Sequence, residues 1–404
     1  MCISFASLAA PLVLLEQTEI ARVKTALKNA TAMADTQKAY QLLLQQADKA
    51  LDLDGFSVTD KKIMPPSKDH HDYLSISRYW WPDETKVDGL PWKRRDGITN
   101  PDTQTDHVDR KRLGAMSRYV SKLSYAYYFS GNEKYAQKGT ALIKKWFLDS
   151  DTKMNPHLEF AQTVPGRDQR RRSGILDGRL IPEKILDAIT LFTPSKHWSE
   201  NDNQKMNLWL SDYLSWLTNS KMGQAGAKQI NNHGSWYYFQ VAALSWYLGD
   251  SQGLKTSLEQ SKIHMLSQFD QQGAQQHELA RTRAFFYSCF NLEALTSIAI
   301  IADKAGDSLW RYPATENSLL ATGVEYLIPA AQGQTWPHAS SNHIDPTDFI
   351  RVLERYNQYS GQKSQKPLLK NLLNTHKNSA ELKQKPSSLY YHFALFKPEV
   401  LLDL

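Results

Sequence analysis

Apolar residues recur at helical spacing along most of the chain, and this pattern restricts the fold more than any other feature. Amphipathic stretches cover residues 19–51 and 109–131, and a third begins after Asn132, a typical helix cap, and runs to about residue 148. Segments such as "IPEKILDAITLF" and "NDNQKMNLWLSDYLSWLTNS" repeat the pattern, and short turns such as "SGNEK" and "LGDSQG" join them. Successive helical hairpins predict an all-α fold, an (α/α) toroid or barrel, rather than an α/β fold.

The chain contains no Pro/Gly/Ser-rich linker, so we expect a single domain over residues 19–404. Residues 1–18 are predicted to be either an apolar N-terminal segment or the remnant of an export signal, since they are largely uncharged but too few to cross a membrane. Residues 61–101 and 151–179 are long, non-helical and rich in Trp, Tyr and Leu. We therefore expect them to pack over one end of the barrel and wall a cleft, with residues 333–348 as a third candidate wall.

The composition favours an anionic, hydroxyl-rich ligand. The net charge of +6 is mild and no long Lys/Arg run occurs, which argues against nucleic acid as a partner. No stretch is long and apolar enough to predict a membrane partner, and two cysteines cannot form a disulfide framework. The chain has 11 Trp and 19 Tyr, and such rings in a groove suit flat sugar surfaces. No oligomeric state follows from these features.

The segment "NNHGSWYYFQ" (residues 231–240) precedes a predicted helix that extends to Leu248. One interpretation is structural, with Asn231 as the helix cap. The other is functional, because a helix N-terminus attracts carboxylates through its free N–H groups. The Asn232 amide would add a neutral donor, and His233 would add a donor or a titratable base.

A second segment, "HELARTRAFFY" (residues 277–287), combines arginines with a tyrosine. If a helix begins near Thr282, Arg283 and Tyr287 share one face, and Arg281 lies at the helix entrance. A neighbouring cation lowers the pKa of a phenol from its usual value of about 10, which would make Tyr287 a usable base. The alternative is a core tyrosine with a surface arginine.

Other candidates lie in the long loops. The segment "GRDQRRRSG" offers Arg171 and Arg172 to substrate carboxylates. His343 is a further candidate contact in the third wall. No His, Asp or Cys spacing matches a closed metal site, and no nucleotide-binding glycine motif occurs, so neither a metal nor a cofactor is predicted. The rings that we expect either to stack on sugars or to fill the core are Tyr79, Trp80, Trp81, Trp236 and Trp336.

Together with the loops "PPSKDHHDYLSISRYWWP" and "DGLPWKRRDGITNP", these two segments resemble the alginate-lyase-like superfamily of polysaccharide lyases over residues 61–295. The sequence looks closest to polysaccharide lyase family 38, which acts on polymannuronate and glucuronan and is related to the family 5 mannuronate lyases. The resemblance implies an (α/α) toroid and a secreted or periplasmic enzyme that acts by β-elimination on an anionic polysaccharide.

The same resemblance assigns Asn232 and His233 to the carboxylate-binding pair of these lyases and Tyr287 to their catalytic tyrosine. In the family the arginine lies one residue farther from the tyrosine than Arg281 does here, so we assign its role first to Arg281 and second to Arg283.

β-Elimination at a uronate removes the proton on C5 and expels the oxygen on C4. The carboxylate must be neutralised as negative charge develops, which we assign to Asn232 and His233 with an arginine. In β-linked mannuronate and glucuronate one tyrosine can act as base and acid, whereas His233 could be the base for the C5 epimers. Two alternatives are a non-catalytic carbohydrate-binding protein and a glycoside hydrolase, which would need two carboxylates from Asp168, Asp177 and Glu278.

Overall fold

A computed structural model describes residues 10–167, 172–313, 318–338, 344–359, 365–376 and 389–397. The protein is mostly helical, with 63% helix and 4% strand, as the helical periodicity predicts. The helices are α1 (Gln17–Lys28), α2 (Ala34–Leu51), α3 (Arg110–Ser130), α4 (Glu133–Phe147), α5 (Leu186–Phe192), α6 (Glu200–Asn219), α7 (Lys221–Ala227), α8 (Asn232–Leu248), α9 (Ser251–Leu266), α10 (Gln276–Leu279), α11 (Ala284–Lys304), α12 (Leu319–Ala331), α13 (Ile350–Tyr359), α14 (Lys366–His376) and α16 (Leu389–Phe396).

Short helical turns and strands lie between them. The turns are η1 (Val58–Asp60), η2 (Pro101–Gln104), η3 (Arg172–Arg179), η4 (Ile181–Ile185), η5 (Leu309–Arg311) and η6 (Pro346–Phe349). The strands are β1 (Leu74–Ile76), β2 (Trp80–Trp81), β3 (Lys93–Arg94) and β4 (Phe160–Thr163).

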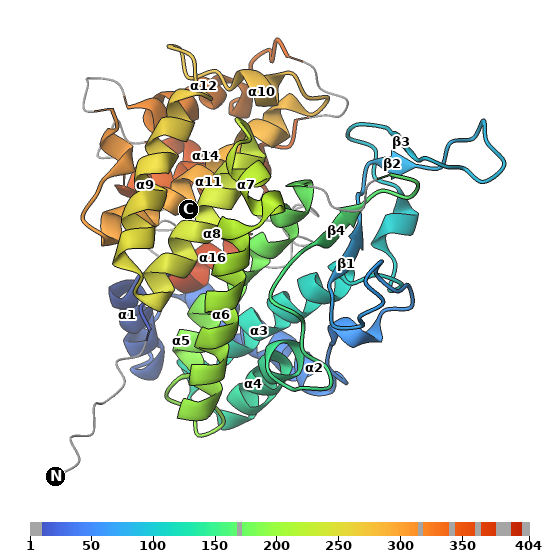
Figure 1. Ribbon diagram of the computed structural model, residues 1–404. Helices are drawn as coiled ribbons and strands as arrows, with labels where there is room; N and C mark the ends of the chain where they lie inside the picture. The colour runs from blue at the N-terminus through green and yellow to red at the C-terminus, as the bar shows by residue number, and fades with distance from the viewer. Residues whose placement is uncertain are drawn as a thin grey trace.

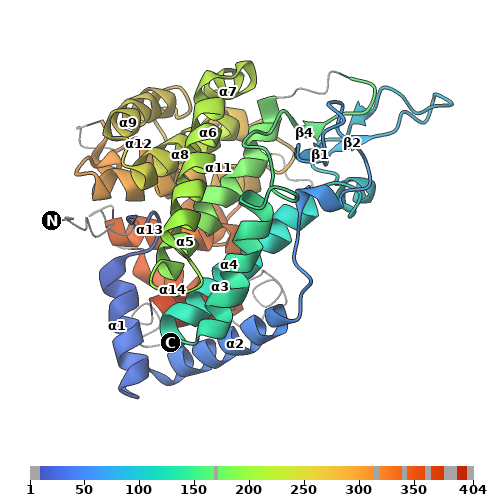
Figure 2. The same ribbon diagram turned by 60° about the horizontal axis from the view of Figure 1, so that its bottom comes forward.

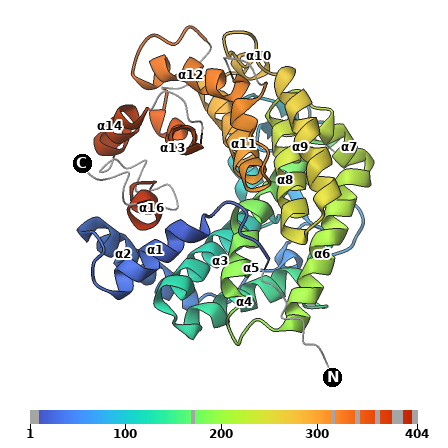
Figure 3. The ribbon, with the colours of Figure 1, turned by 90° about the vertical axis from the view of Figure 1, so that its left-hand side faces the viewer.

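Helical hairpins follow one another around a ring. Figure 3 shows α1 and α2 leading into α3–α6, then α8 and α9, then α11–α14, and α16 returning to lie beside the start of the ring. Contacts between α16 and α2 bring the two ends of the chain together. One hydrophobic core runs through the ring and includes residues from Leu12 to Phe396. The predicted (α/α) toroid is therefore confirmed.

Local sequence signals explain where several helices begin and end. Helix α3 ends at Gly131, which has a left-handed φ of 69°. Asn132 then caps α4 by accepting a hydrogen bond from the Lys134 N–H at 3.1 Å. Helix α11 has the length and composition of a membrane span, but 83% of its most apolar window is buried inside the protein, as in a core helix.

The two long non-helical stretches meet on one side of the ring. Strand β1 from the first stretch pairs in parallel with β4 from the second, with Leu74 opposite Phe160. Strands β2 and β3 pair antiparallel within the first stretch. Figures 1 and 2 show these strands together beside the helical ring, near the N-terminal end of α3. The prediction that these stretches pack against one end of the barrel is confirmed.

The apolar N-terminal segment is part of the fold where the structure describes it. Asp187 on α5 accepts hydrogen bonds from the backbone N–H groups of Val13, Leu14 and Leu15. Leu12 and Val13 belong to the hydrophobic core. Of the two expectations for residues 1–18, the part from residue 10 onward fits an apolar segment of the domain, and residues 1–9 lie outside the described chain.

Candidate active site

A cleft of about 960 Å³ lies where the two long loops meet the start of α8 and the start of α11. Residues from four segments that are far apart in the sequence line it, so the folded ring is needed to assemble it. Its lining residues are Ser77, Arg78, Tyr79, Trp80, Arg94, Arg110, Glu159, Gln162, Ser173, Leu176, Arg179, Ser220, Lys221, Met222, Ala225, Gln229, Asn231, Asn232, His233, Arg281, Phe286, Tyr287 and Phe290. The sequence-predicted residues among them are Asn231, Asn232, His233, Arg281, Tyr287, Tyr79 and Trp80.

Positive charge dominates this cleft. Glu159 is its only carboxylate among the lining residues that the structure describes, and it accepts a hydrogen bond from the Trp216 indole at 2.8 Å. Converging cations without an equal number of anions create a potential that attracts an anionic ligand. The cations of the lining are Arg78, Arg94, Arg110, Arg179, Lys221 and Arg281.

A buried carboxylate, Asp177, contacts Arg110 and joins the two long loops. It accepts hydrogen bonds from Ser75 at 2.6 Å and from Gln162 at 3.0 Å, and it lies 3.4 Å from Arg110. Burial raises the pKa of Asp177, but Arg110 and the hydrogen bonds lower it by more, so the carboxyl stays ionised. Sequence reasoning missed Arg78, Arg110 and Arg179 as cleft residues, because no local motif marks three arginines in separate segments.

The N–H groups at the start of α8 already donate hydrogen bonds to other groups of the protein. Asn231 is the helix cap, and its side chain accepts a hydrogen bond from the His233 N–H at 3.1 Å. The Asn232 N–H donates to a carboxylate at 2.6 Å, but that carboxylate is Glu278. The expectation that free N–H groups of this helix bind the substrate is therefore wrong. Gly234 permits the close approach of this turn, since a Cβ atom there would clash with the Gln229 carbonyl.

The side chain of Asn232 also turns toward Glu278. Its Nδ2 donates to Glu278 Oε1 at 2.9 Å and to Oε2 at 2.8 Å, and both residues are only 1% exposed. Burial raises the pKa of Glu278 to about 7, although the hydrogen bonds from Asn232 lower it. As the side chains lie here, Asn232 faces the cleft without the free amide hydrogens that the sequence interpretation requires.

Tyr287 meets a second tyrosine and an arginine at the start of α11. Its hydroxyl lies 2.9 Å from the Tyr79 hydroxyl, and the Arg281 guanidinium lies 3.7 Å from the centre of its ring. Arg281 also forms a two-point ion pair with Asp96, at 3.0 Å and 2.7 Å. Tyr79 is therefore a hydrogen-bond partner of Tyr287, a contact that its predicted stacking role did not include.

The pKa of Tyr287 is shifted in the direction opposite to the predicted one. Burial raises it above the usual value, and the lowering effect of Arg281 is not large enough to compensate. Burial also raises the pKa of Asp96, but the neighbouring Arg281 and Arg94 lower it by more than burial raises it. Asp96 therefore stays ionised and holds the Arg281 guanidinium in place. In the free protein Tyr287 is consequently a neutral phenol.

Arg283 caps α11 one turn before Tyr287, but its side chain does not line the cleft. Helix α11 begins at Ala284, and in the preceding turn the Thr282 hydroxyl and Arg281 are bound to Asp96. The Arg283 guanidinium lies 4.3 Å from the centre of the Phe286 ring and does not line the cleft. The predicted contact between Arg283 and the substrate is thus contradicted.

The predicted aromatic contacts divide into two groups. Trp80 lines the cleft, with the Arg167 guanidinium 4.9 Å from the centre of its ring, whereas Trp81 lies outside it. Trp236 is 0% exposed and belongs to the core, so it cannot stack on a sugar. Trp336 packs against Phe285 beside the core and does not line the cleft, so of its two predicted roles the packing one fits the structure.

Three predicted binding residues cannot be placed. Arg171 and His343 lie outside the described residues, and the side chain of Arg172 does as well. Asp168, a candidate carboxylate for hydrolysis, also lies outside the described residues. Within the described part of the chain, no three His, Cys, Asp or Glu side chains are grouped as metal ligands.

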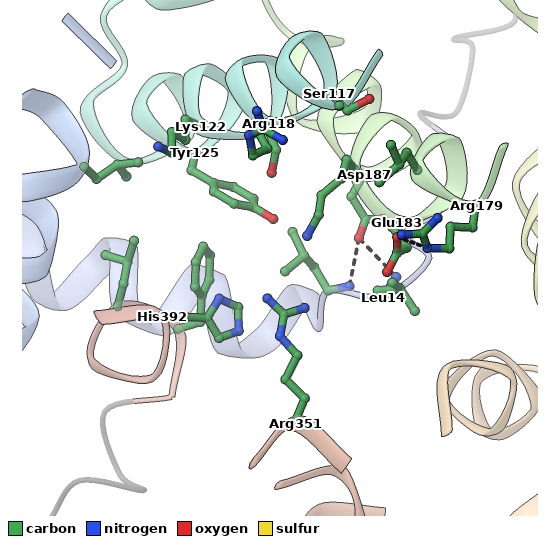
Figure 4. A pocket seen from close by; sticks show the side chains of 18 of the residues that line it. Leu14, Ser117, Arg118, Lys122, Tyr125, Arg179, Glu183, Asp187, Arg351 and His392 are labelled. Carbon is green, nitrogen blue, oxygen red and sulfur yellow. Dashed lines mark hydrogen bonds and ion pairs between the residues drawn. The ribbon is translucent and has the colours of Figure 1, made fainter. Parts of the chain in front are cut away.

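A second cavity of about 760 Å³, here called the inner chamber, lies inside the ring behind the cleft. Arg78, Arg110 and Arg179 line both cavities and so form the layer between them. Figure 4 shows Arg118, Lys122 and Tyr125 projecting from α3 into the inner chamber, with Arg351 and His392 facing them from α13 and α16. The asparagine, histidine and tyrosine of the cleft are not part of its lining.

Comparisons with known proteins agree on one family. The sequence model of the alginate lyase family matches residues 57–336. The crystal structure of an alginate lyase from Bacteroides ovatus is 30% identical in sequence and covers 96% of this chain and 99% of its own, with a TM-score of 0.86. No curated protein matches the sequence.

More distant structures share the fold. Alginate lyase A1-III from Sphingomonas species A1 is 14% identical and covers 87% of this chain and 91% of its own, with a TM-score of 0.53. A variant of alginate lyase A1-III complexed with a tetrasaccharide is 14% identical and covers 87% and 90%, with a TM-score of 0.55.

Proposed function

Because this chain belongs to the alginate lyase family and is a polysaccharide lyase, we propose that it cleaves β-1,4-linked uronate polymers, either polymannuronate or glucuronan, by β-elimination. We also propose that it stands closest to polysaccharide lyase family 38 and that it acts in the periplasm or outside the cell. One observation carries the proposal: a single cationic cleft brings together the asparagine, histidine, arginine and tyrosine that the elimination needs.

The arginine layer supports binding of the uronate carboxylates. Arg78 Nε and Arg110 Nη1 are buried and have no hydrogen-bond partner among the described residues. Charge-assisted hydrogen bonds to a carboxylate would satisfy such groups. In our proposal Arg78, Arg110 and Arg179 hold the polymer, while His233 faces the carboxylate of the sugar that reacts.

Tyr287 is proposed as base and acid. Its oxygen takes the C5 proton, the C5–H electrons form the C4=C5 double bond, and the C4 oxygen leaves with a proton from the same phenol. Since Tyr287 starts as a neutral phenol, its own proton must first leave. The Tyr79 hydroxyl at 2.9 Å offers the route, and Arg281 over the ring stabilises the phenolate that forms.

The geometry gives Arg281 a different part from the one proposed from the sequence. Its guanidinium is already bound at two points to Asp96 and lies over the Tyr287 ring. We therefore propose that it acts on the phenol rather than on the substrate carboxylate. For polymers of the C5 epimers, His233 is the proposed base, because the base and the acid must then lie on opposite faces of the sugar.

Hydrolysis is less well supported by this site. A glycosidase needs two carboxyl groups across the cleft, and Glu159 is the only one among the described lining residues. Asp177 and Glu278, two of the sequence candidates, are buried and bound to neighbouring side chains.

Absorbance spectroscopy tests the function directly. The protein is incubated with polymannuronate, glucuronan and polyguluronate, and the ultraviolet absorbance of a new C4=C5 double bond is followed. We expect it with polymannuronate or glucuronan. New reducing ends without that absorbance would show hydrolysis and refute the proposal, and the absence of any product from all three would favour a binding protein.

A further inference from the structure

The carboxylate of Glu278 binds Asn232 and lies outside the cleft lining that the structure describes. Three hydrogen bonds of 2.6, 2.9 and 2.8 Å join its two oxygens to the backbone N–H and the side-chain amide of Asn232. Asn232 itself lines the cleft, so Glu278 lies behind it and acts on a ligand only through it.

The charge of Glu278 decides which end of the Asn232 amide faces the cleft. An ionised carboxylate can only accept hydrogen bonds, so it takes the Nδ2 hydrogens and leaves Oδ1 for the cleft. An amide oxygen beside a uronate carboxylate is repulsive. A protonated carboxyl has one O–H donor, which can bind Oδ1, while its second oxygen still accepts the Asn232 N–H. The amide is then turned over, with Nδ2 toward the cleft.

We propose that Glu278 is a positioning residue that takes up a proton when substrate binds and so turns the NH₂ group of Asn232 toward the uronate carboxylate. This inference rests on the proposed function of the same cleft. It requires no covalent step, and the proton comes from solvent. With the amide turned over, Asn232 can donate a hydrogen bond to the substrate carboxylate, which it cannot do while its NH₂ group is bound to Glu278.

The surroundings of Glu278 make this uptake feasible at neutral pH. Burial already raises its pKa to about 7, and Arg281 is the cation that opposes this rise. The charge of Arg281 is shared with Asp96, from the loop after β3. Other titratable side chains on the helices at this end of the cleft include His233 on α8, His277 on α10 and Tyr287 on α11. A substrate carboxylate adds negative charge beside Asn232, which raises the pKa of Glu278 further.

Calorimetry on a non-reacting complex measures the proton directly. The Tyr287→Phe variant is titrated with a saturated mannuronate tetramer, or a glucuronate tetramer if the wild type prefers glucuronan, near pH 8 in two buffers of different ionisation enthalpy. We expect uptake approaching one proton. We also expect affinity to fall about tenfold for each further pH unit, because binding is then linked to one proton.

Three second-site variants assign the proton. Gln at position 278 offers an N–H donor and an acceptor without titrating, so Glu278→Gln should abolish the uptake and the pH dependence while keeping affinity within about threefold. Glu278→Ala should weaken binding tenfold or more, also without uptake. His233→Gln is the control for the histidine that lines the cleft, and it should retain the uptake.

Unchanged proton uptake in Glu278→Gln, or binding by the parent without any uptake, would overturn the inference. Loss of uptake in His233→Gln but not in Glu278→Gln would assign the proton to the histidine instead. These outcomes are distinct from failure of the proposed function, in which the wild-type protein would neither bind the tetramers nor release unsaturated products.

Discussion

The cleft and the inner chamber are both cationic, share Arg78, Arg110 and Arg179, and have similar volumes, yet they differ in how their charges are arranged. The chamber mixes Arg118, Lys122 and Lys184 with carboxylates such as Glu183 and Asp187, and Asp187 is used to hold the N-terminal segment. The cleft has one lining carboxylate among its described residues.

The difference also extends to the neutral groups. In the cleft an amide, an imidazole and two phenols lie among the cations. The buried Glu278 orients Asn232, and Tyr79 and Arg281 contact Tyr287. Positive charge can therefore attract a polyanion, but oriented neutral groups are what perform proton transfer. Matched substitutions in the two cavities test this distinction.

The phenols give the largest expected contrast. Tyr287→Phe should lower kcat about a thousandfold or more, because one hydroxyl acts as base and acid, with little change in affinity. Tyr125→Phe removes a phenol of the chamber and should leave turnover unchanged. Initial rates from the ultraviolet absorbance of the unsaturated product provide the measurement. Turnover retained by Tyr287→Phe would disprove its role, and equal losses in both variants would remove the distinction between the cavities.

The arginines give the next contrast. Arg281→Lys should lower kcat about tenfold to a hundredfold, because lysine cannot form the two-point pair with Asp96 while covering the Tyr287 ring. Arg118→Lys in the chamber preserves the charge and should have no effect. The measurement is kcat under saturating polymer. A normal kcat for Arg281→Lys would show that only the charge at this position matters.

The sequence predicted the ring, and half of the site residues that it named line the cleft, for physical reasons. Asn132 and Gly131 mark helix ends through local backbone chemistry, so they could be read from the sequence. Trp236 and Trp80 are both aromatic residues in or near recognised motifs, yet one is fully buried and the other lines the cleft. Only the packing of the ring determines which one is which.

Non-local partners account for further misses. The Asn232 amide and the Tyr287 pKa depend on Glu278, Tyr79 and burial, none of which is adjacent in sequence. The Arg283 side chain lies over the Phe286 ring rather than in the cleft, and its spacing from Tyr287 in the sequence does not reveal this. The contacts of Asn232 and Tyr287 could not be predicted because their partners are far apart in the sequence, not because the contacts are weak.

A smaller effect concerns substrate affinity. Arg78→Gln removes a half-buried cation of the layer between the two cavities and should raise KM about tenfold, because a charge-assisted hydrogen bond to a uronate is lost. Lys122→Ala removes a cation from the chamber alone and should leave KM unchanged. KM from initial rates at fixed ionic strength provides the measurement. A rise in KM for Lys122→Ala as large as that for Arg78→Gln would mean that the chamber also binds polymer.

The smallest expected effect separates the two cavities by the pH dependence of stability. Burial raises the pKa of Glu278 from 4.5 to about 7, so the folded protein binds more protons than the unfolded chain in that window. The free energy of unfolding should therefore fall by about 1–3 kcal/mol as the pH rises through it. Burial, with Arg351 nearby, lowers the pKa of Lys184 in the chamber to about 8 from 10.5. The unfolded chain then binds more protons, and stability should rise between pH 8 and 10.5.

Urea unfolding across pH measures both slopes, and one variant for each cavity assigns them. Glu278→Gln should reduce the fall between about pH 4.5 and 7 and leave the alkaline rise in place. Lys184→Met should remove the alkaline rise and leave the fall. If Glu278→Gln retains the full decrease in stability, Glu278 is not the group that binds the extra proton in the folded protein. The cleft would then differ from the chamber in its neutral side chains but not in a protonated buried carboxyl group.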